Sequence, residues 1–100
     1  MKLIDLVKRV EAAGLEVRLN SDKDGSLFLW GWTNRPAARC EPVFGCILES
    51  ETNDVASRSE VRIAAELAVA AEHPDAIWSR EINAKIDEKN AVGARAANAA

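Results

Sequence analysis

Three side chains have the types that thiol catalysis or zinc binding would use: Cys40, Cys46 and the single histidine, His73. A cysteine nucleophile needs a base beside it, and His73 is the only candidate. Two cysteines and one histidine do not complete a four-ligand zinc site, and their spacing matches no zinc-binding motif. The sequence therefore predicts no catalytic residue and no metal site, and we expect a protein that is not an enzyme.

A second pattern is similar to the start of a calcium-binding loop. Asn20, Asp22, Asp24 and Gly25 have the order of residues that such a loop begins with. The loop closes with a bidentate carboxylate at its last position, where this sequence has Gly31. The same residues are typical of a polar turn in a β-hairpin. We therefore expect a turn without calcium, and no cofactor.

The composition limits the class of protein. The chain has 100 residues with 48% hydrophobic content, which suits one small globular domain. Its formal net charge of −3 argues against direct binding of nucleic acid through phosphate neutralisation. No signal peptide or membrane-spanning run is recognisable, so we expect a cytoplasmic protein with no membrane partner. Its cysteines are then expected to be reduced, although their spacing leaves a local disulfide open.

Hydrophobic periodicity predicts an α+β domain in the order α-β-β-β-α-α, with an antiparallel three-stranded sheet covered by helices. The expected helices and strands cover residues 2–13, 16–20, 26–32, 43–48, 57–72 and 76–90. We interpret residues 1–92 as a single domain and the alanine-rich residues 93–100 as a frayed C-terminal tail. The predicted core consists of Leu6, Val10, Val17, Leu19, Leu27, Ile47, Val61, Leu67, Ile82 and Ile86.

The last two expected helices admit two interpretations. A helix-turn-helix that binds DNA would bring base-reading and phosphate-binding side chains together on its second helix. The final helix instead carries equal numbers of basic and acidic side chains, namely Arg80, Lys85, Lys89, Glu81, Asp87 and Glu88. An antiparallel helical pair that covers the sheet is therefore the favoured interpretation.

The second strand of the expected hairpin carries three large aromatic residues. Phe28, Trp30 and Trp32 alternate along it, so all three lie on one face, while Leu29 lies on the other. Large aromatic side chains in small domains are mostly buried. We expect a helix to cover Phe28 and Trp30, with Trp78 completing the cluster. Trp32 stands at the strand end, where either the core or a docking surface would suit it.

The segment 41–54 contains four carboxylates and no Lys or Arg, so it carries −4 while the other 86 residues sum to +1. One interpretation is a solvated loop; the other is a decoy for phosphate groups that docks on a basic groove. In a three-stranded meander the first turn and the exit of the third strand share one end, so their carboxylates should act together. Trp32 would lie at the other end of its strand. The predicted partner-binding residues are Asp22, Asp24, Trp32, Glu49, Glu51 and Asp54.

Within residues 3–32, apolar positions and two glycines form the pattern Leu3-Ile4-Asp5-Leu6-Val7, Ala12-Ala13-Gly14-Leu15-Glu16-Val17-Arg18-Leu19 and Asp24-Gly25-Ser26-Leu27. This pattern resembles the opening of the small N-terminal docking domains of modular peptide synthetases. Those domains place a hairpin after a first helix and use it to grip a partner's terminal segment. The resemblance implies a docking or adaptor role, which is our alternative function.

Taken as a whole, the chain is a small acidic domain without a catalytic motif. In these respects it is similar in type to small phage-encoded inhibitors, of which anti-CRISPR proteins are the best-known group. The similarity implies inhibition by occupying a surface that a CRISPR surveillance complex uses for nucleic acid or for recruiting its nuclease. We therefore expect a non-enzymatic inhibitor whose partner is a protein within a nucleic-acid-handling complex.

Overall fold

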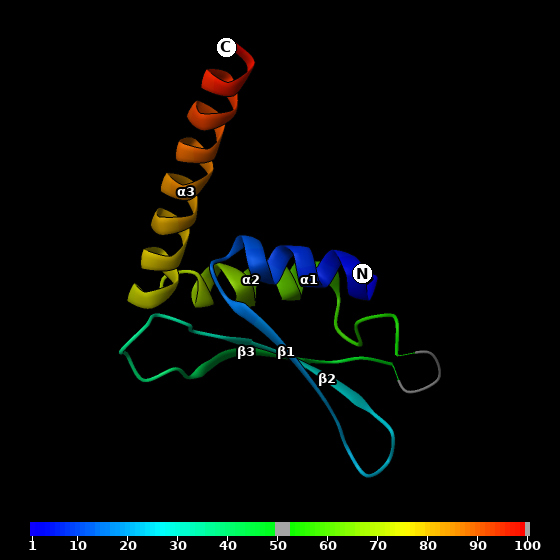
Figure 1. The fold of residues 1–100 in the computed structure, drawn as a ribbon. Coiled ribbons are helices and arrows are strands. Elements are labelled where there is room, and N and C mark those ends of the chain that lie inside the picture. The colour runs from blue at the N-terminus through cyan, green and yellow to red at the C-terminus, as the bar shows by residue number, and fades with distance from the viewer. Residues whose placement is uncertain (50–52, 100) are drawn as a thin grey trace.

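The computed structural model describes residues 1–49 and 53–99, and Figure 1 shows their fold. The strands form one antiparallel sheet in the order β1-β2-β3. The predicted α+β class and the order α-β-β-β-α-α are both confirmed. The elements are α1 (Leu3–Ala12), β1 (Glu16–Ser21), β2 (Leu27–Trp32), β3 (Pro42–Ile47), α2 (Glu60–Ala70) and α3 (Pro74–Ala99).

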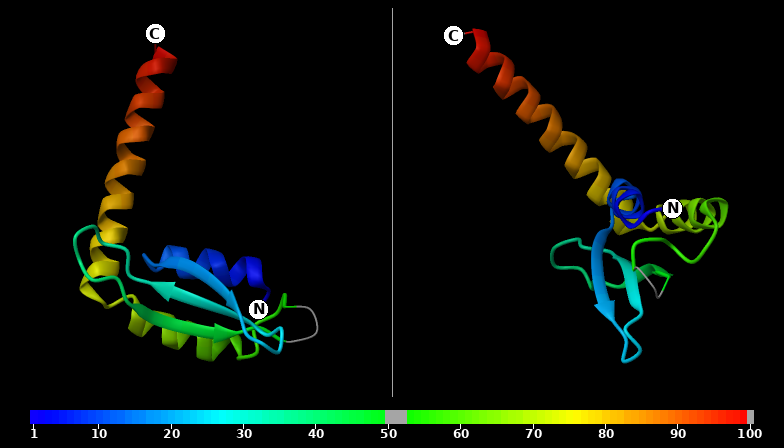
Figure 2. Two further views of the ribbon diagram at one scale, coloured as in Figure 1. Left: turned by 60° about the horizontal axis from the view of Figure 1, so that its bottom comes forward. Right: turned by 90° about the vertical axis from the view of Figure 1, so that its right-hand side faces the viewer.

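Helices α1 and α2 lie on the same face of the sheet, and the hydrophobic core lies between them and the strands (Figure 2). Arg9 of α1 pairs with Glu60 of α2 at 2.8 Å, which links the two helices at the surface. Burial of each large aliphatic side chain contributes about 1.5–3 kcal/mol to this packing. The buried apolar residues are Leu6, Val10, Leu15, Leu29, Phe44, Cys46, Leu48, Ala56, Ile63, Leu67, Ala70 and Ala76.

The structure confirms half of the predicted core. Leu6 and Val10 of α1 and Leu67 of α2 are buried. Val17 and Leu27 are partly buried and pack against the core cluster. The helical spacing of α1 and the alternation in the hairpin therefore identified the covered faces of these elements correctly.

The prediction is wrong for the other five residues, which are exposed or only half-buried. Leu19 is exposed because it lies on the edge strand, at the rim of the covered face. Ile47 is exposed because its position in β3 places it on the uncovered face of the sheet. Val61 faces solvent in the first turn of α2 with 82% of its surface exposed. Ile86 is exposed and Ile82 only half-buried, because α3 leaves the body of the protein at this point.

A glycine allows α3 to approach the end of α1. Gly14 has a φ of +89°, a conformation that side chains with a Cβ rarely adopt. A Cβ at this position would lie 2.3 Å from the carbonyl oxygen of Ala76 in α3. Arg80 of α3 also donates a hydrogen bond to the carbonyl oxygen of Ala13 at 2.5 Å. The first turns of α3 are therefore fixed against the turn between α1 and β1.

The N-terminus of α3 is also held by the loop between β2 and β3. His73 Nδ1 accepts a hydrogen bond from the backbone N–H of Asp75 at 3.1 Å, so His73 caps the helix. His73 Nε2 lies 2.7 Å from Glu41 Oε1. Arg35 Nη1 lies 3.7 Å from Asp75 Oδ1. These contacts tie the loop containing Arg35 and Glu41 to the first turn of α3.

Beyond this anchor α3 projects away from the sheet, so the molecule measures 56 × 29 × 26 Å (Figure 1). The predicted antiparallel pair of α2 and α3 covering the sheet is therefore wrong; α2 covers it and α3 does not. The backbone remains helical to Ala99, where the sequence predicts a frayed tail over residues 93–100.

Candidate protein interface

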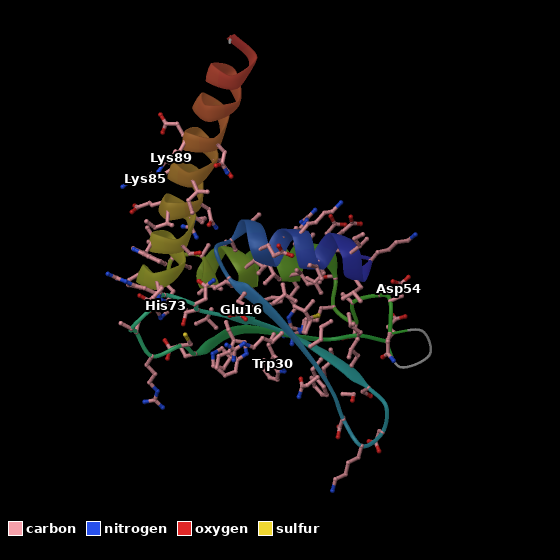
Figure 3. The ribbon with its side chains drawn as sticks, viewed as in Figure 1. Glu16, Trp30, Asp54, His73, Lys85 and Lys89 are labelled. Carbon is pink, nitrogen blue, oxygen red and sulfur yellow. The ribbon has the colours of Figure 1, made fainter. Side chains whose placement is uncertain are left out.

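The face of the sheet opposite the helices carries the three aromatic residues of β2. Alternation along the strand buries Leu29 and Gly31 on the helix side and leaves Phe28, Trp30 and Trp32 half-buried on the other side. Figure 3 shows Trp30 on the side of the sheet away from α1 and α2. The prediction that a helix covers Phe28 and Trp30 is therefore wrong, because both helices that pack on the sheet lie on its other face.

Trp30 is held in one orientation by three contacts. Its indole N–H donates a hydrogen bond to Asn20 Oδ1 at 2.7 Å. Its ring stacks with Phe28 at a centroid distance of 6.2 Å and an interplanar angle of 12°. It also lies across Gly45 of β3, where a Cβ would come within 2.7 Å of Cζ3. The absence of a side chain on Gly45 therefore lets the indole lie flat on the sheet.

Trp32 is covered by an arginine from the neighbouring strand. The guanidinium of Arg18 lies 4.2 Å from the centroid of the Trp32 ring, a cation–π contact worth about 0.5–1 kcal/mol at an exposed site. Arg18 is in turn 3.5 Å from Glu16 on the same strand. Arg18 is paired with Trp30 in the strand register, so its contact with Trp32 is a diagonal one. Asn20 is paired with Phe28 and makes the equivalent diagonal contact with Trp30.

We call this surface the aromatic face and define it by Arg18, Asn20, Phe28, Trp30, Trp32 and Ile47. Ile47 stands opposite Phe28 in the register and is 42% exposed, so it extends the apolar surface onto β3. Tryptophan and arginine are the residues most enriched at energetic centres of protein interfaces. The described helices leave this face uncovered (Figure 2).

The sequence correctly placed the three aromatic residues on one face of the strand, but it assigned Phe28 and Trp30 to the core and missed the residues that position the rings. Trp78, expected to complete the aromatic cluster, lies instead beside Arg35, whose guanidinium is 5.5 Å from its ring centroid. Arg18 and Asn20 could have been assigned to the aromatic face from the period of two in β1 together with the hairpin register. Gly45 carried a weaker signal, since a glycine inside an apolar strand often marks a close approach.

The structure places four of the five predicted carboxylates at one end of the sheet. Asn53 connects the two segments that carry them: its Oδ1 accepts a hydrogen bond from the Leu27 N–H at 3.2 Å, and its Nδ2 donates to the Gly25 carbonyl at 3.3 Å. We define the acidic end as Asp22 and Asp24 of the hairpin turn with Glu49 and Asp54 beside Asn53. All four residues are exposed. Glu51 lies outside the described residues.

Trp32 lies at the opposite end of β2 from this acidic end. It pairs with Glu16 and with Pro42, whereas the acidic turn follows Ser21 and precedes Leu27. The six residues of β2 place its two ends about 17 Å apart. The six predicted partner-binding residues therefore do not form one cluster, although the aromatic face extends between Trp32 and the acidic end.

Among the described residues, no hydrogen bond joins either cysteine to His73. Cys40 is exposed, Cys46 is buried, and both are free thiols. Burial raises the pKa of the Cys46 thiol. Both ring nitrogens of His73 are engaged, by Glu41 and by the Asp75 N–H. Within residues 1–49 and 53–99, no three His, Cys, Asp or Glu side chains converge as metal ligands would.

Comparisons of the chain with protein-family models, with curated proteins and with solved structures find no match. Among the described residues, no helix combines the length and the apolar character that crossing a bilayer requires.

Proposed function

We propose that this protein is a non-enzymatic binding protein that docks on another protein through the aromatic face. The observation that supports the proposal is the row of three aromatic side chains on a sheet face that no described helix covers. Such a surface has the composition of an interface centre, where truncation of a hot-spot residue costs about 2 kcal/mol or more of binding free energy.

Preorganisation of the aromatic face favours binding further. Trp30 is already fixed by Asn20, Phe28 and Gly45, and Trp32 by Arg18. Immobilising a side chain on binding costs about 0.5–1.5 kcal/mol. Because these contacts already order the tryptophan side chains in the free protein, binding loses less side-chain entropy. Because the rings are partly ordered before the encounter, more of the burial energy is available for affinity.

The charge of the acidic end favours a partner that presents a basic surface. Its carboxylates lie beyond the aromatic face at the hairpin end, where they would form a charged rim around an apolar centre. Complementary charge across such a rim speeds association. We propose that the partner is a nucleic-acid-handling complex, such as a CRISPR surveillance complex, and that docking blocks its basic nucleic-acid or recruitment surface.

A protein partner fits these charges better than nucleic acid does. The only cation defined as part of the aromatic face, Arg18, lies over Trp32 and beside Glu16. The net charge of −3 opposes approach to a phosphate backbone. A gel-shift series across salt concentrations tests this point: we expect no shift of single- or double-stranded DNA or RNA even at low salt. A shift that weakens steeply with salt would favour a nucleic-acid-binding regulator instead.

The alternative function, a docking or adaptor domain, is favoured by the free edge of β1. This strand pairs only with β2 among the described strands, and five of its six residues are exposed. An exposed edge can accept an extended peptide as an additional strand. This function would place the partner's terminal segment beside Arg18 and Asn20 rather than across Trp30.

Affinity capture from host lysate with quantitative mass spectrometry tests the proposed function. Four baits are compared: the parent protein, Trp30→Ala, Trp32→Ala and the control Val61→Ala, which changes an exposed residue of α2. We expect the parent and the control to enrich the same nucleic-acid-handling proteins, and both tryptophan variants to lose them. Equal enrichment by all four baits, with the fold preserved, would contradict docking through the aromatic face.

A further inference from the structure

The sheet has an open edge along β1. This strand pairs with β2 on one side, and no other strand of the described residues pairs with it. Five of its six residues are exposed, and Leu19 exposes 48% of its surface. An open strand edge presents backbone N–H and C=O groups that can pair with a strand of another chain.

The opposite edge of the sheet is protected. β3 begins with Pro42, which has no N–H and suits an edge position. Near the other end of β3, the Ile47 carbonyl accepts hydrogen bonds from the backbone N–H of Ser57 at 3.0 Å and from its hydroxyl at 2.7 Å. β1 contains no proline and no lysine, and its register with β2 is unbroken. Of the two edges, β1 is therefore the one suited to pairing between chains.

The hairpin register identifies the backbone groups of β1 that face outward. The Asp22 N–H donates to the Ser26 carbonyl at 2.9 Å, one step beyond the last pair of the β1–β2 register. Bonded and non-bonded positions alternate along an antiparallel strand, so the even-numbered residues of β1 bond to β2. The odd-numbered residues, among them Val17 and Leu19, therefore direct their backbone N–H and C=O groups away from the sheet.

The charges of β1 complement those of a second copy in one antiparallel register. When Val17 stands opposite Val17 of the second copy, Glu16 faces Arg18 and Arg18 faces Glu16. Opposite charges at directly facing positions stabilise a strand pair, and like charges destabilise it. A register centred on Arg18 would set two arginines against each other, and one centred on Leu19 would set Glu16 against Asp22. The register centred on Val17 is therefore favoured.

We propose that β1 pairs with β1 of a second copy of this chain in the register centred on Val17, so that two sheets join into one continuous antiparallel sheet. Val17 exchanges backbone hydrogen bonds with Val17 of the second copy, and Glu16 and Arg18 form ion pairs in both directions. Leu19, exposed in the single chain, stands opposite Leu15 of the second copy.

Self-pairing does not rest on docking through the aromatic face. Directly paired residues lie on the same face of a sheet, so the aromatic faces of both copies lie on one side and stay open. The second copy occupies the strand edge that the alternative docking function would give to a partner's terminal segment. The two occupants of this edge are therefore distinguishable with the purified protein alone.

Sedimentation equilibrium of the purified full chain over a wide concentration range tests self-pairing. We expect a reversible monomer–dimer equilibrium, together with amide exchange at Val17 and Leu19 that slows as the protein concentration rises. A monomer at every concentration would overturn the proposal. A dimer whose Val17 and Leu19 amides exchange as fast as those of the monomer would overturn it as well.

Charge variants test the register. Glu16→Arg and Arg18→Glu, each alone, set like charges against each other and should weaken dimerisation about tenfold or more. An equal mixture of the two variants should restore it, because opposite charges then face each other across the pair. Glu72→Arg, the same reversal at an exposed position just beyond α2, should leave dimerisation unchanged. Single variants that dimerise like the parent, or a mixture that restores nothing, would overturn the proposal.

Discussion

Gly45 of β3 lies directly beneath the ring of Trp30 of β2, so closely that a Cβ on Gly45 would stand 2.7 Å from Cζ3 and 2.9 Å from Cε3 of the indole. The two residues are paired in the strand register. The indole therefore packs directly on the backbone of Gly45, whereas a residue with a side chain at this position would hold the ring away from the sheet. Asn20 then fixes the edge of the same ring through its indole N–H.

Substitution Gly45→Ala should displace the Trp30 ring from the sheet. Because the ring is on the solvent side, it can swing outward, so we expect a change of about 1 kcal/mol or less in the free energy of unfolding. The hydrogen bond to Asn20 should be lost, and the Trp30 indole N–H resonance should move toward its solvent-exposed position. An unchanged indole resonance in the NMR spectrum would contradict the close packing of these two residues.

Substitution Leu67→Ala should destabilise the protein by about 2–5 kcal/mol, because Leu67 is 7% exposed and packs in the core beneath α2. Val61→Ala, on the same helix with 82% of the residue exposed, should change stability by about 0.5 kcal/mol or less. Thermal and denaturant unfolding of both variants measures the difference. Similar stabilities for the two would mean that α2 does not pack on the sheet through Leu67.

The two cysteines should differ sharply in reactivity. Cys40 is exposed, whereas burial raises the pKa of the Cys46 thiol and shields it. Iodoacetamide at neutral pH should therefore alkylate Cys40 in the folded protein and reach Cys46 only after unfolding. Peptide mapping by mass spectrometry reads both sites, and fast labelling of Cys46 in the folded protein would be the opposite result.

The same pKa shift gives a pH dependence. An unfolded cysteine has a pKa of about 8.5, and the folded-state pKa of Cys46 is higher than the ordinary value. The folded state therefore holds the proton more tightly, so the contribution to stability is complete below about pH 8.5 and is lost as pH rises through the folded-state pKa. In Cys46→Ala this alkaline decline should be smaller than in the parent protein.

Charge reversal at the acidic end tests the basic partner surface. Asp22, Asp24 and Glu49 are exposed, so their simultaneous replacement by Lys should leave the fold intact. We expect slower association with the partner and a weaker dependence of affinity on salt, because the charge attraction is removed. Affinity and salt dependence equal to those of the parent would leave the aromatic face as the whole interface.

The fold class could be predicted because its signals are local. Leu6 and Val10 repeat at helical spacing, and the turn around Gly25 separates two alternating segments, so the elements and their order followed from the chain. The shared end of Asp22, Asp24 and Asp54 followed from the geometry of a meander. The hydrogen bonds through which Asn53 connects these segments depend on a loop conformation that periodicity does not specify.

The covered face of the sheet could not be predicted in full, because β2 is apolar on both faces. Leu29 faces one side, and Phe28 and Trp30 face the other, so burial alone favoured helices on both. The structure places α1 and α2 on the Leu29 side and lets α3 project away. The direction of α3 is set by Gly14 and Arg80, contacts between residues far apart in sequence.

Site-specific photo-crosslinking tests the central claim, that the partner docks on the aromatic face, most directly. A benzophenone amino acid is placed at Ile47, on the aromatic face, and separately at Val61, on the outer surface of α2. After irradiation in host lysate, we predict a discrete protein adduct from the Ile47 position and none from the Val61 position. The adduct should disappear when the protein labelled at Ile47 also carries the substitution Trp30→Ala. A discrete adduct from Val61 with none from Ile47 would contradict docking through the aromatic face.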